Sequence, residues 1–187
     1  MFLPFMQMVS SEPYFIIDTE TTGLDDGEIV QIAILSHKRE TLLDTLVRPS
    51  RPIPPDATRI HGITNDMVKE GRMWYHVQQD MLSIIRGQNV VIYNAVYDRR
   101  MMHQTDERHD LAHIDYKTLA TFHCAMLAYA EFWGDWNSYH RSYRWQRLTE
   151  AVRQQRIDVI DAHTALGDCL MTWEVIERMK VQHATDS

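Results

Sequence analysis

Two acidic side chains, Asp18 and Glu20, follow a short apolar run in the sequence Tyr-Phe-Ile-Ile-Asp-Thr-Glu. Such a run is typical of a buried strand, and side chains two positions apart on a strand point to the same face. Both carboxylates are therefore expected at the carboxyl end of a strand, where open α/β sheets place their binding sites. Oxygen ligands of this kind suit a hard divalent cation such as Mg²⁺. A solvated strand end is the plainer alternative, but the apolar run favours burial.

Three further polar residues occupy positions from which they can reach the same edge of a sheet. Asp98 follows a second apolar run, Asn89 to Tyr93, after a gap of four residues, although an Asp there is more often a helix cap. His163 and Asp168 would lie about 140° apart on one ideal helix, so they share a site only if His163 precedes the helix. Thr164 can cap a helix that begins directly after it, which permits this arrangement.

The elements that must position these residues follow from the apolar pattern. Tyr14 to Asp18 predicts one strand, while Glu28 to Leu35 and Thr41 to Val47 predict an antiparallel hairpin. After the hairpin, helices are predicted over Trp74 to Ile85, Asp98 to Gln104, His123 to Phe132, Trp145 to Gln155 and Leu166 to Met179. A hairpin followed by alternating strands and helices favours a mixed α/β sheet with helices on both faces.

The composition limits the class of protein. With 187 residues, 44% of them hydrophobic, the chain can form one domain with a sizeable core. A net charge of −7 argues against coating nucleic acid through bulk positive charge. No run is apolar enough for a membrane span, and residues 1–9 lack the basic residues of a signal peptide. The two cysteines give no disulfide framework, so a cytoplasmic location is the default expectation.

Three motifs in order resemble the DEDD exonuclease superfamily, in its histidine-bearing (DEDDh) DnaQ-like branch. They are Asp18-Thr19-Glu20-Thr21-Thr22-Gly23-Leu24, Tyr93-Asn94-Ala95-Val96-Tyr97-Asp98 and His163-Thr164-Ala165-Leu166-Gly167-Asp168. The segment Ile60-His61-Gly62-Ile63-Thr64 also resembles one that family members carry after the third strand. The branch includes the epsilon subunit of bacterial DNA polymerase III, exonuclease X and RNase T.

The resemblance implies a ribonuclease H-like fold, which is a mixed five-stranded sheet flanked by helices, and hydrolysis with two Mg²⁺ or Mn²⁺ ions. Asp18, Glu20 and Asp168 would hold one ion. Asp18 would bridge to the second ion, and Asp98 would support that ion directly or through water. Two ions can stabilise both the attacking and the leaving oxygen of an in-line displacement. His163 would be the general base that deprotonates the attacking water.

The same resemblance implies a set of substrate contacts. Thr21 and Gly23 would contact the 3′ end of the strand, and Leu24 would wedge against the terminal bases. The nucleotide pocket would be lined by His61, Tyr93, Asn94 and Tyr97. Tyr97 stands where family members commonly have Phe, a change that keeps the aromatic face.

The favoured function is a 3′→5′ exonuclease that hydrolyses single-stranded or frayed DNA from its 3′ end and releases nucleoside 5′-monophosphates. A 3′→5′ exoribonuclease is a second candidate, because DNA and RNA ends differ here by one 2′-hydroxyl. A non-catalytic module that binds 3′ ends is the alternative from another class, and the intact acids argue against it. The oligomeric state stays open.

The expected division of the chain has three parts. Residues 1–12 are an irregular leader, residues 13–182 form the exonuclease domain, and residues 183–187 are a C-terminal tail. The chain ends soon after the third motif, so no polymerase-binding tail of the epsilon kind is evident, and a free-standing exonuclease is the expectation.

Two clusters outside the motifs need an interpretation. Arg141 to Arg156 contains five arginines and one acid, beside a group of aromatic residues. Such a stretch can guide a single nucleic-acid strand, or it is a helix with a solvated basic face and aromatics that fill the core. Four histidines and a cysteine between His103 and Cys124 match no zinc-ligand spacing.

Overall fold

The sheet is built around β1 (Tyr14–Thr21), in a computed structural model that describes residues 1–159 and 163–185. The strand order is β3-β2-β1-β4-β5. β1 pairs antiparallel with β2 and parallel with β4, β2 pairs antiparallel with β3, and β4 pairs parallel with β5. The other four strands are β2 (Ile29–Ser36), β3 (Thr41–Leu46), β4 (Asn89–Ile92) and β5 (Thr121–Cys124).

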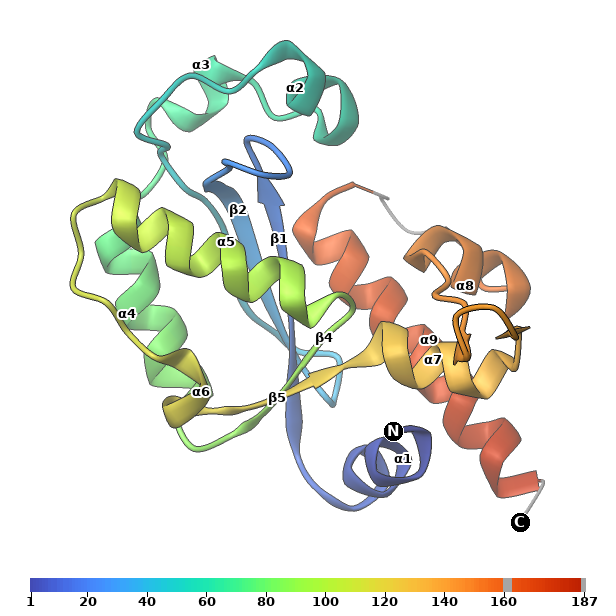
Figure 1. Ribbon diagram of the computed structural model, residues 1–187. Coiled ribbons are helices and arrows are strands. Elements are labelled where there is room, and N and C mark those ends of the chain that lie inside the picture. The colour runs from blue at the N-terminus through green and yellow to red at the C-terminus, as the bar shows by residue number, and fades with distance from the viewer. Residues whose placement is uncertain (160–162, 186–187) are drawn as a thin grey trace.

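Helices cover both faces of this sheet (Figure 1). One face carries α4 (Trp74–Ile85), α5 (Ala95–Arg108) and α6 (Tyr116–Leu119). The other carries α1 (Phe2–Ser11), α7 (Ala125–Trp133), α8 (Leu148–Gln154) and α9 (Ala165–Thr185). Side chains alternate along a strand, so Ile16 of β1 is buried in one apolar cluster and Ile17 in the other. The predicted mixed five-stranded α/β sheet flanked by helices is confirmed.

A third, smaller layer lies beyond the ends of β1 and β2 (Figure 1). It consists of α2 (Pro55–His61) and α3 (Asn65–Val68), which bury a small cluster that includes Ile53 and Ile63. The Thr64 side chain accepts from the backbone N–H of Met67 and caps α3. Gly62 ends α2 with φ 74°, a left-handed conformation that glycine adopts without strain.

The first residues are not an irregular leader, as the sequence predicted, but the helix α1. Pro4 is compatible with this helix because it stands in the first turn, where backbone N–H groups have no intrahelical partner. The helix buries Phe5, Met6 and Val9 in the cluster that it shares with α7 and α9. The apolar character of this segment therefore comes from packing.

Three other predicted limits are wrong. The helix predicted from His123 begins only at Ala125, because residues Thr121–Cys124 pair with β4 as an edge strand. The helix predicted from Trp145 begins at Leu148, after a short hairpin of β6 (Trp136–Asn137) and β7 (Ser142–Tyr143). The predicted tail limit at residue 182 falls inside α9. None of the helices within the described residues is both long and apolar enough to cross a membrane.

Candidate active site

Side chains at the carboxyl end of β1 face two helices, one on each side of the sheet. Asp18 and Glu20 project to the same face as Ile16, which is the face covered by α9. Thr19 projects to the opposite face, where its hydroxyl donates to Asp98 Oδ1 of α5 at 2.8 Å. The pairing of β1 with β2 shifts register between Glu20 and Thr21, and such irregularities re-aim side chains at strand ends. One strand end thus reaches the acids of both helices.

The third motif has the local structure that its sequence predicts. α9 begins at Ala165, the hydroxyl of Thr164 accepts from the N–H of Gly167 at 3.0 Å, and Asp168 lies in the first turn. His163 precedes the helix with φ 68°, a left-handed conformation in which histidine is enriched. Its backbone N–H lies 3.3 Å from Asp168 Oδ1. The turn brings the histidine and the carboxylate together.

The structure brings all four acids and the histidine to one cavity. Carboxylate oxygens of Asp18, Glu20 and Asp168 lie within 4.8 Å of one another. Asp98 and His163 line the same cavity, which has a volume of about 190 Å³. The three converging carboxylates are hard oxygen donors, which fits a divalent cation such as Mg²⁺ or Mn²⁺.

The electrostatics of this cavity also fit a cation. Burial, then the charges of Asp168 and Asp98, raise the pKa of Glu20 to about 8. Burial raises the pKa of Asp98 to about 7, although the Thr19 hydroxyl opposes this. Burial and the three neighbouring acids raise the pKa of Asp18 well above its usual value. Without a cation, the cluster cannot hold all its charges near neutral pH, and a bound divalent ion would compensate them.

A larger cavity of about 430 Å³ adjoins the carboxylates and shares Thr19, Glu20 and Tyr97 with them. Tyr97 and Thr21 form a hydroxyl–hydroxyl hydrogen bond of 2.6 Å, and the Tyr97 hydroxyl also donates to the Gly23 carbonyl at 3.3 Å. Five of the seven predicted substrate residues line this pocket: Thr21, Gly23, Leu24, His61 and Tyr97. The remaining two, Tyr93 and Asn94, line the carboxylate cavity instead.

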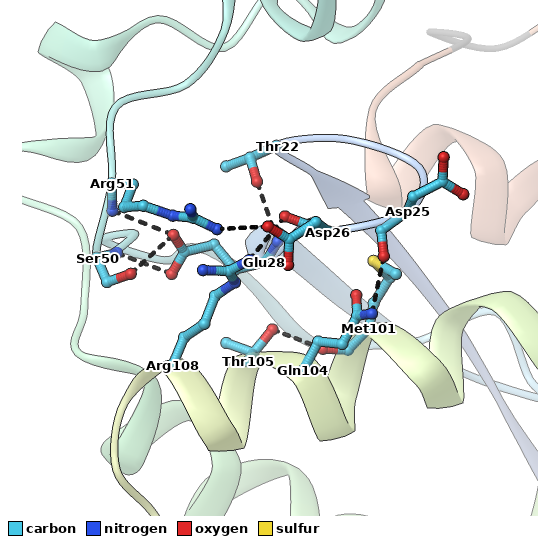
Figure 2. Close-up of polar contacts among 10 residues, drawn as sticks. All are labelled: Thr22, Asp25, Asp26, Glu28, Ser50, Arg51, Met101, Gln104, Thr105 and Arg108. Atoms are coloured by element: carbon cyan, nitrogen blue, oxygen red, sulfur yellow. Dashed lines mark hydrogen bonds and ion pairs between the residues drawn. The ribbon is translucent and has the colours of Figure 1, made fainter.

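The loop that carries Leu24 is held on α5 by three side chains spaced four residues apart. Arg100, Gln104 and Arg108 donate to three consecutive backbone carbonyls, those of residues 24, 25 and 26, at 2.7, 2.8 and 2.9 Å. Residues at this spacing share one helix face. Figure 2 shows Gln104 and Arg108 reaching the loop from α5. The exposed Leu24 side chain therefore stands on a backbone that is fixed to the sheet's helical layer.

The start of β2 connects the same loop to the segment that leads to α2. The buried Glu28 carboxylate accepts from the N–H of Ser50 at 2.8 Å, the Ser50 hydroxyl at 3.0 Å and the N–H of Arg51 at 3.1 Å (Figure 2). His109 Nε2 lies 3.3 Å from the same carboxylate. Glu28 thus links the start of β2 to the C-terminal end of α5 and to the segment that leads to α2.

Replacing Glu28 by Ala should lower the free energy of unfolding by roughly 1–3 kcal/mol at pH 7, because its donors lose their acceptor. Burial alone would raise the pKa of Glu28, but hydrogen bonds from His109, Ser50 and Arg51 hold it below its usual value. This stabilisation is present above the usual carboxyl pKa and is lost as the pH falls through the lower folded value. Urea unfolding should show that the difference in free energy of unfolding between wild type and Glu28→Ala is smaller in acid than at pH 7. The control is Glu70→Ala, which changes an exposed acid. If Glu28→Ala and Glu70→Ala were equally stable at pH 7, the stabilising role of Glu28 would be contradicted.

The histidines between His103 and His123 do not converge as a group of three metal ligands within the described part of the chain. Within the described residues, the only group of three or more potential ligands that converge is the acidic one. The rings of His103 and His113 stack on each other at 5.3 Å, and His123 Nε2 bonds to Asn89 Oδ1 at 3.1 Å. These histidines have structural contacts.

The sheet has antiparallel and parallel parts, and converging carboxylates and a histidine lie at the carboxyl end of its central strand. This combination defines a nuclease with a ribonuclease H-like fold. The chain belongs to the RNase T exonuclease family, whose model, described as "Exonuclease", matches residues 15–176. It is 40% identical over 167 residues to the uncharacterized exonuclease CP81 of Escherichia phage 186, covering 87% of this chain and 86% of that one.

Two further relatives agree with this membership. The DNA polymerase III subunit epsilon of Treponema pallidum (strain Nichols) is 27% identical over 172 residues, which cover 89% of this chain and 76% of that protein. The solved structure of exonuclease X in complex with 5′ overhanging duplex DNA superposes with a TM-score of 0.67. It is 27% identical and covers 91% of this chain and 93% of that chain. The predicted family and the prediction of an enzyme are confirmed.

Two contributors to the site were not singled out from the sequence. Thr19 stands between the two acids, and strand alternation alone predicts that its side chain faces the other side of the sheet from theirs. Leu148, the first residue of α8, lines the carboxylate cavity, and no pattern in the sequence indicates it.

Proposed function

We propose that the protein is a metal-dependent 3′→5′ exonuclease that removes nucleotides one at a time from single-stranded or frayed DNA ends. The observation that carries this proposal is the adjacency of the carboxylate cavity and the larger pocket, which share Glu20 and Tyr97. A phosphate at the carboxylates would leave the last nucleotide of the strand in the pocket. Cleavage of the bond between that phosphorus and the 3′ oxygen of the preceding nucleotide would release one nucleoside 5′-monophosphate at a time.

The converging carboxylates of Asp18, Glu20 and Asp168 support the following metal roles. Asp18, Glu20 and Asp168 would hold one Mg²⁺ or Mn²⁺, and Asp18 with Asp98 would hold the second. When bound, the two ions supply the positive charge that stabilises the attacking and leaving oxygens. Thr19 orients the Asp98 carboxylate through its hydroxyl, so it is a positioning residue in this scheme.

His163 would handle the proton of the attacking water. Its side chain is exposed at the cavity edge, and its imidazole would take the proton as the water oxygen bonds to phosphorus. The bond between phosphorus and the 3′ oxygen of the preceding nucleotide breaks, and that oxygen receives a proton from solvent. The hydrogen bond from the His163 backbone N–H to Asp168 fixes the backbone position from which the imidazole side chain extends.

The larger pocket would select the terminal nucleotide. The Thr21 hydroxyl and the Gly23 carbonyl are the polar groups expected to bind the 3′-hydroxyl, while Tyr97 and His61 would flank the sugar and base. Leu24, 73% exposed, would wedge beside the terminal base. DNA is the favoured substrate because the epsilon subunit and the exonuclease X complex both carry DNA in their names.

Digestion of end-labelled oligonucleotides tests the whole proposal. With Mg²⁺ or Mn²⁺, a 5′-labelled DNA strand should shorten stepwise from its 3′ end, and a 3′-labelled strand should release a labelled mononucleotide at once. EDTA should stop both reactions. A matched RNA strand should be cut more slowly; faster cutting of RNA would favour the exoribonuclease, and release of nucleotides from the 5′ end would overturn the polarity.

A further inference from the structure

We propose a second binding surface that holds single-stranded DNA on the far side of the bond being cut. It consists of Tyr139, Arg141, Trp145 and Arg147, in the segment between α7 and α8, and of the cavity that Trp145 borders. We call it the Trp145 surface. The inference rests on the proposed function, because it follows the same strand away from its 3′ end.

The cavity beside Trp145 adjoins the carboxylates. It has a volume of about 350 Å³ and lies between the start of α5 and α7. Asn94 and Tyr97 line both this cavity and the carboxylate cavity, while Val96 and Leu127 give it an apolar lining. A strand with a phosphate at the carboxylates would therefore have this cavity within reach of an adjacent base.

The aromatic side chains of this segment do not fill the core. Tyr139 is 88% exposed and Trp145 is 71% exposed. Trp136 and Tyr143 pack edge to face with ring centroids 5.1 Å apart, and their backbones pair across the hairpin. The paired rings stiffen the hairpin, while Tyr139 and Trp145 present faces on which bases can stack.

The backbone next to Trp145 is fixed to the active site. The hydroxyl of Tyr93, a residue of the carboxylate cavity, donates to the Gln146 carbonyl at 2.8 Å. The Gln154 side chain of α8 donates to Gln146 Oε1 at 2.9 Å. Two contacts thus hold the residue after Trp145, so the backbone that carries the indole has a defined place relative to the carboxylates.

The charges of this segment suit a phosphate backbone. Although the chain carries a net charge of −7, three arginines lie in the seven residues from Arg141 to Arg147. Arg144 is only 3.9 Å from Asp135, whereas Arg141 and Arg147 form no ion pair within residues 1–159 and 163–185. Unpaired arginines interleaved with exposed aromatics are the combination that binds single strands through phosphates and bases together.

Two substrates of different length test the Trp145 surface. The p-nitrophenyl ester of thymidine 5′-monophosphate occupies only the terminal position, whereas single-stranded oligothymidylate also extends upstream. Trp145→Ala should raise KM for oligothymidylate roughly tenfold with kcat largely kept, since base–aromatic stacking is lost. Its kcat/KM for the ester should stay at the wild-type value. Trp145→Phe should restore most of the affinity for oligothymidylate.

The arginines should show a different signature. The double variant Arg141→Ala/Arg147→Ala should weaken oligothymidylate binding and reduce the slope of log KM against log salt by about 1.4, as expected for two lost phosphate contacts on a single strand. The matched controls are Tyr75→Ala, on α4, and Arg86→Ala, directly after it, at the other side of the sheet (Figure 1). They should leave KM and kcat unchanged for both substrates.

Three outcomes would overturn the inference. An unchanged KM for oligothymidylate in Trp145→Ala would refute the Trp145 surface. Normal digestion by the wild-type protein in the same experiment would leave the proposed function intact. Equal losses on both substrates would show that Trp145 only supports the fold of the site. A wild-type protein that hydrolyses neither substrate with Mg²⁺ would overturn the proposed function and the Trp145 surface together.

Discussion

Replacing Asp18 by Asn should abolish hydrolysis, with a fall in kcat on the order of 10³-fold or more, because a bridging metal ligand and its charge are lost. The same change should stabilise the metal-free protein. Burial and three neighbouring acids raise the pKa of Asp18, so its charged form is unfavourable in the folded state. An amide of the same shape removes that repulsion. Loss of activity with gain of stability distinguishes a site acid from a structural one.

The pH dependence of this stability difference has a defined sign. An acid whose folded pKa is raised stabilises the fold least when it is charged, so wild-type stability without metal should fall as the pH rises above the usual carboxyl pKa of about 4. The melting temperature of Asp18→Asn should therefore exceed that of wild type increasingly over this range, by about 2–4 °C for each kcal/mol.

Added Mg²⁺ should reverse the order, since an ion that binds only the folded protein stabilises it. At pH 8, saturating Mg²⁺ should raise the melting temperature of wild type more than that of Asp18→Asn. Glu70→Gln, the same change at an exposed acid, should alter neither activity nor the response to Mg²⁺. Near-normal hydrolysis by Asp18→Asn, or a metal-free variant less stable than wild type at pH 8, would contradict the assignment.

The local geometry of the acids could be predicted because it depends on short-range rules. Strand alternation puts Asp18 and Glu20 on one face, and a cap at Thr164 leaves His163 just before the helix that carries Asp168. The plainer alternative, a solvated strand end, does not describe Asp18. The structure buries part of its surface, because β1 lies in the middle of the sheet with α9 across it.

Long-range packing explains what the sequence did not reveal. β5 has only four residues and is a strand because β4 pairs with it. The helix α1 forms where its apolar residues meet α7 and α9, with no side-chain cap to announce it. Arg100, Gln104 and Arg108 share a helix face in any helical reading, but only the fold brings the Leu24 loop alongside them.

Removing the imidazole of His163 should lower kcat by roughly 10²–10⁴-fold while leaving substrate affinity largely intact, the range expected for loss of a general base. The backbone decides which variant isolates the imidazole. His163 has φ 68°, a conformation that strains alanine but not glycine. His163→Gly therefore removes the side chain while keeping the turn that bonds to Asp168.

Because the His163 side chain is exposed, small molecules from solvent can reach the position it leaves. Added imidazole should restore part of the lost rate of His163→Gly in a concentration-dependent manner, since it can accept the proton of the attacking water. Neither His76→Gly, at an exposed position of α4, nor Asp18→Asn should respond to imidazole. The measurement is kcat on the p-nitrophenyl ester and on oligothymidylate, with the affinity for oligothymidylate followed by fluorescence anisotropy. A variant that lost affinity rather than turnover, or that imidazole failed to rescue on either substrate, would show that His163 shapes the site without accepting the proton.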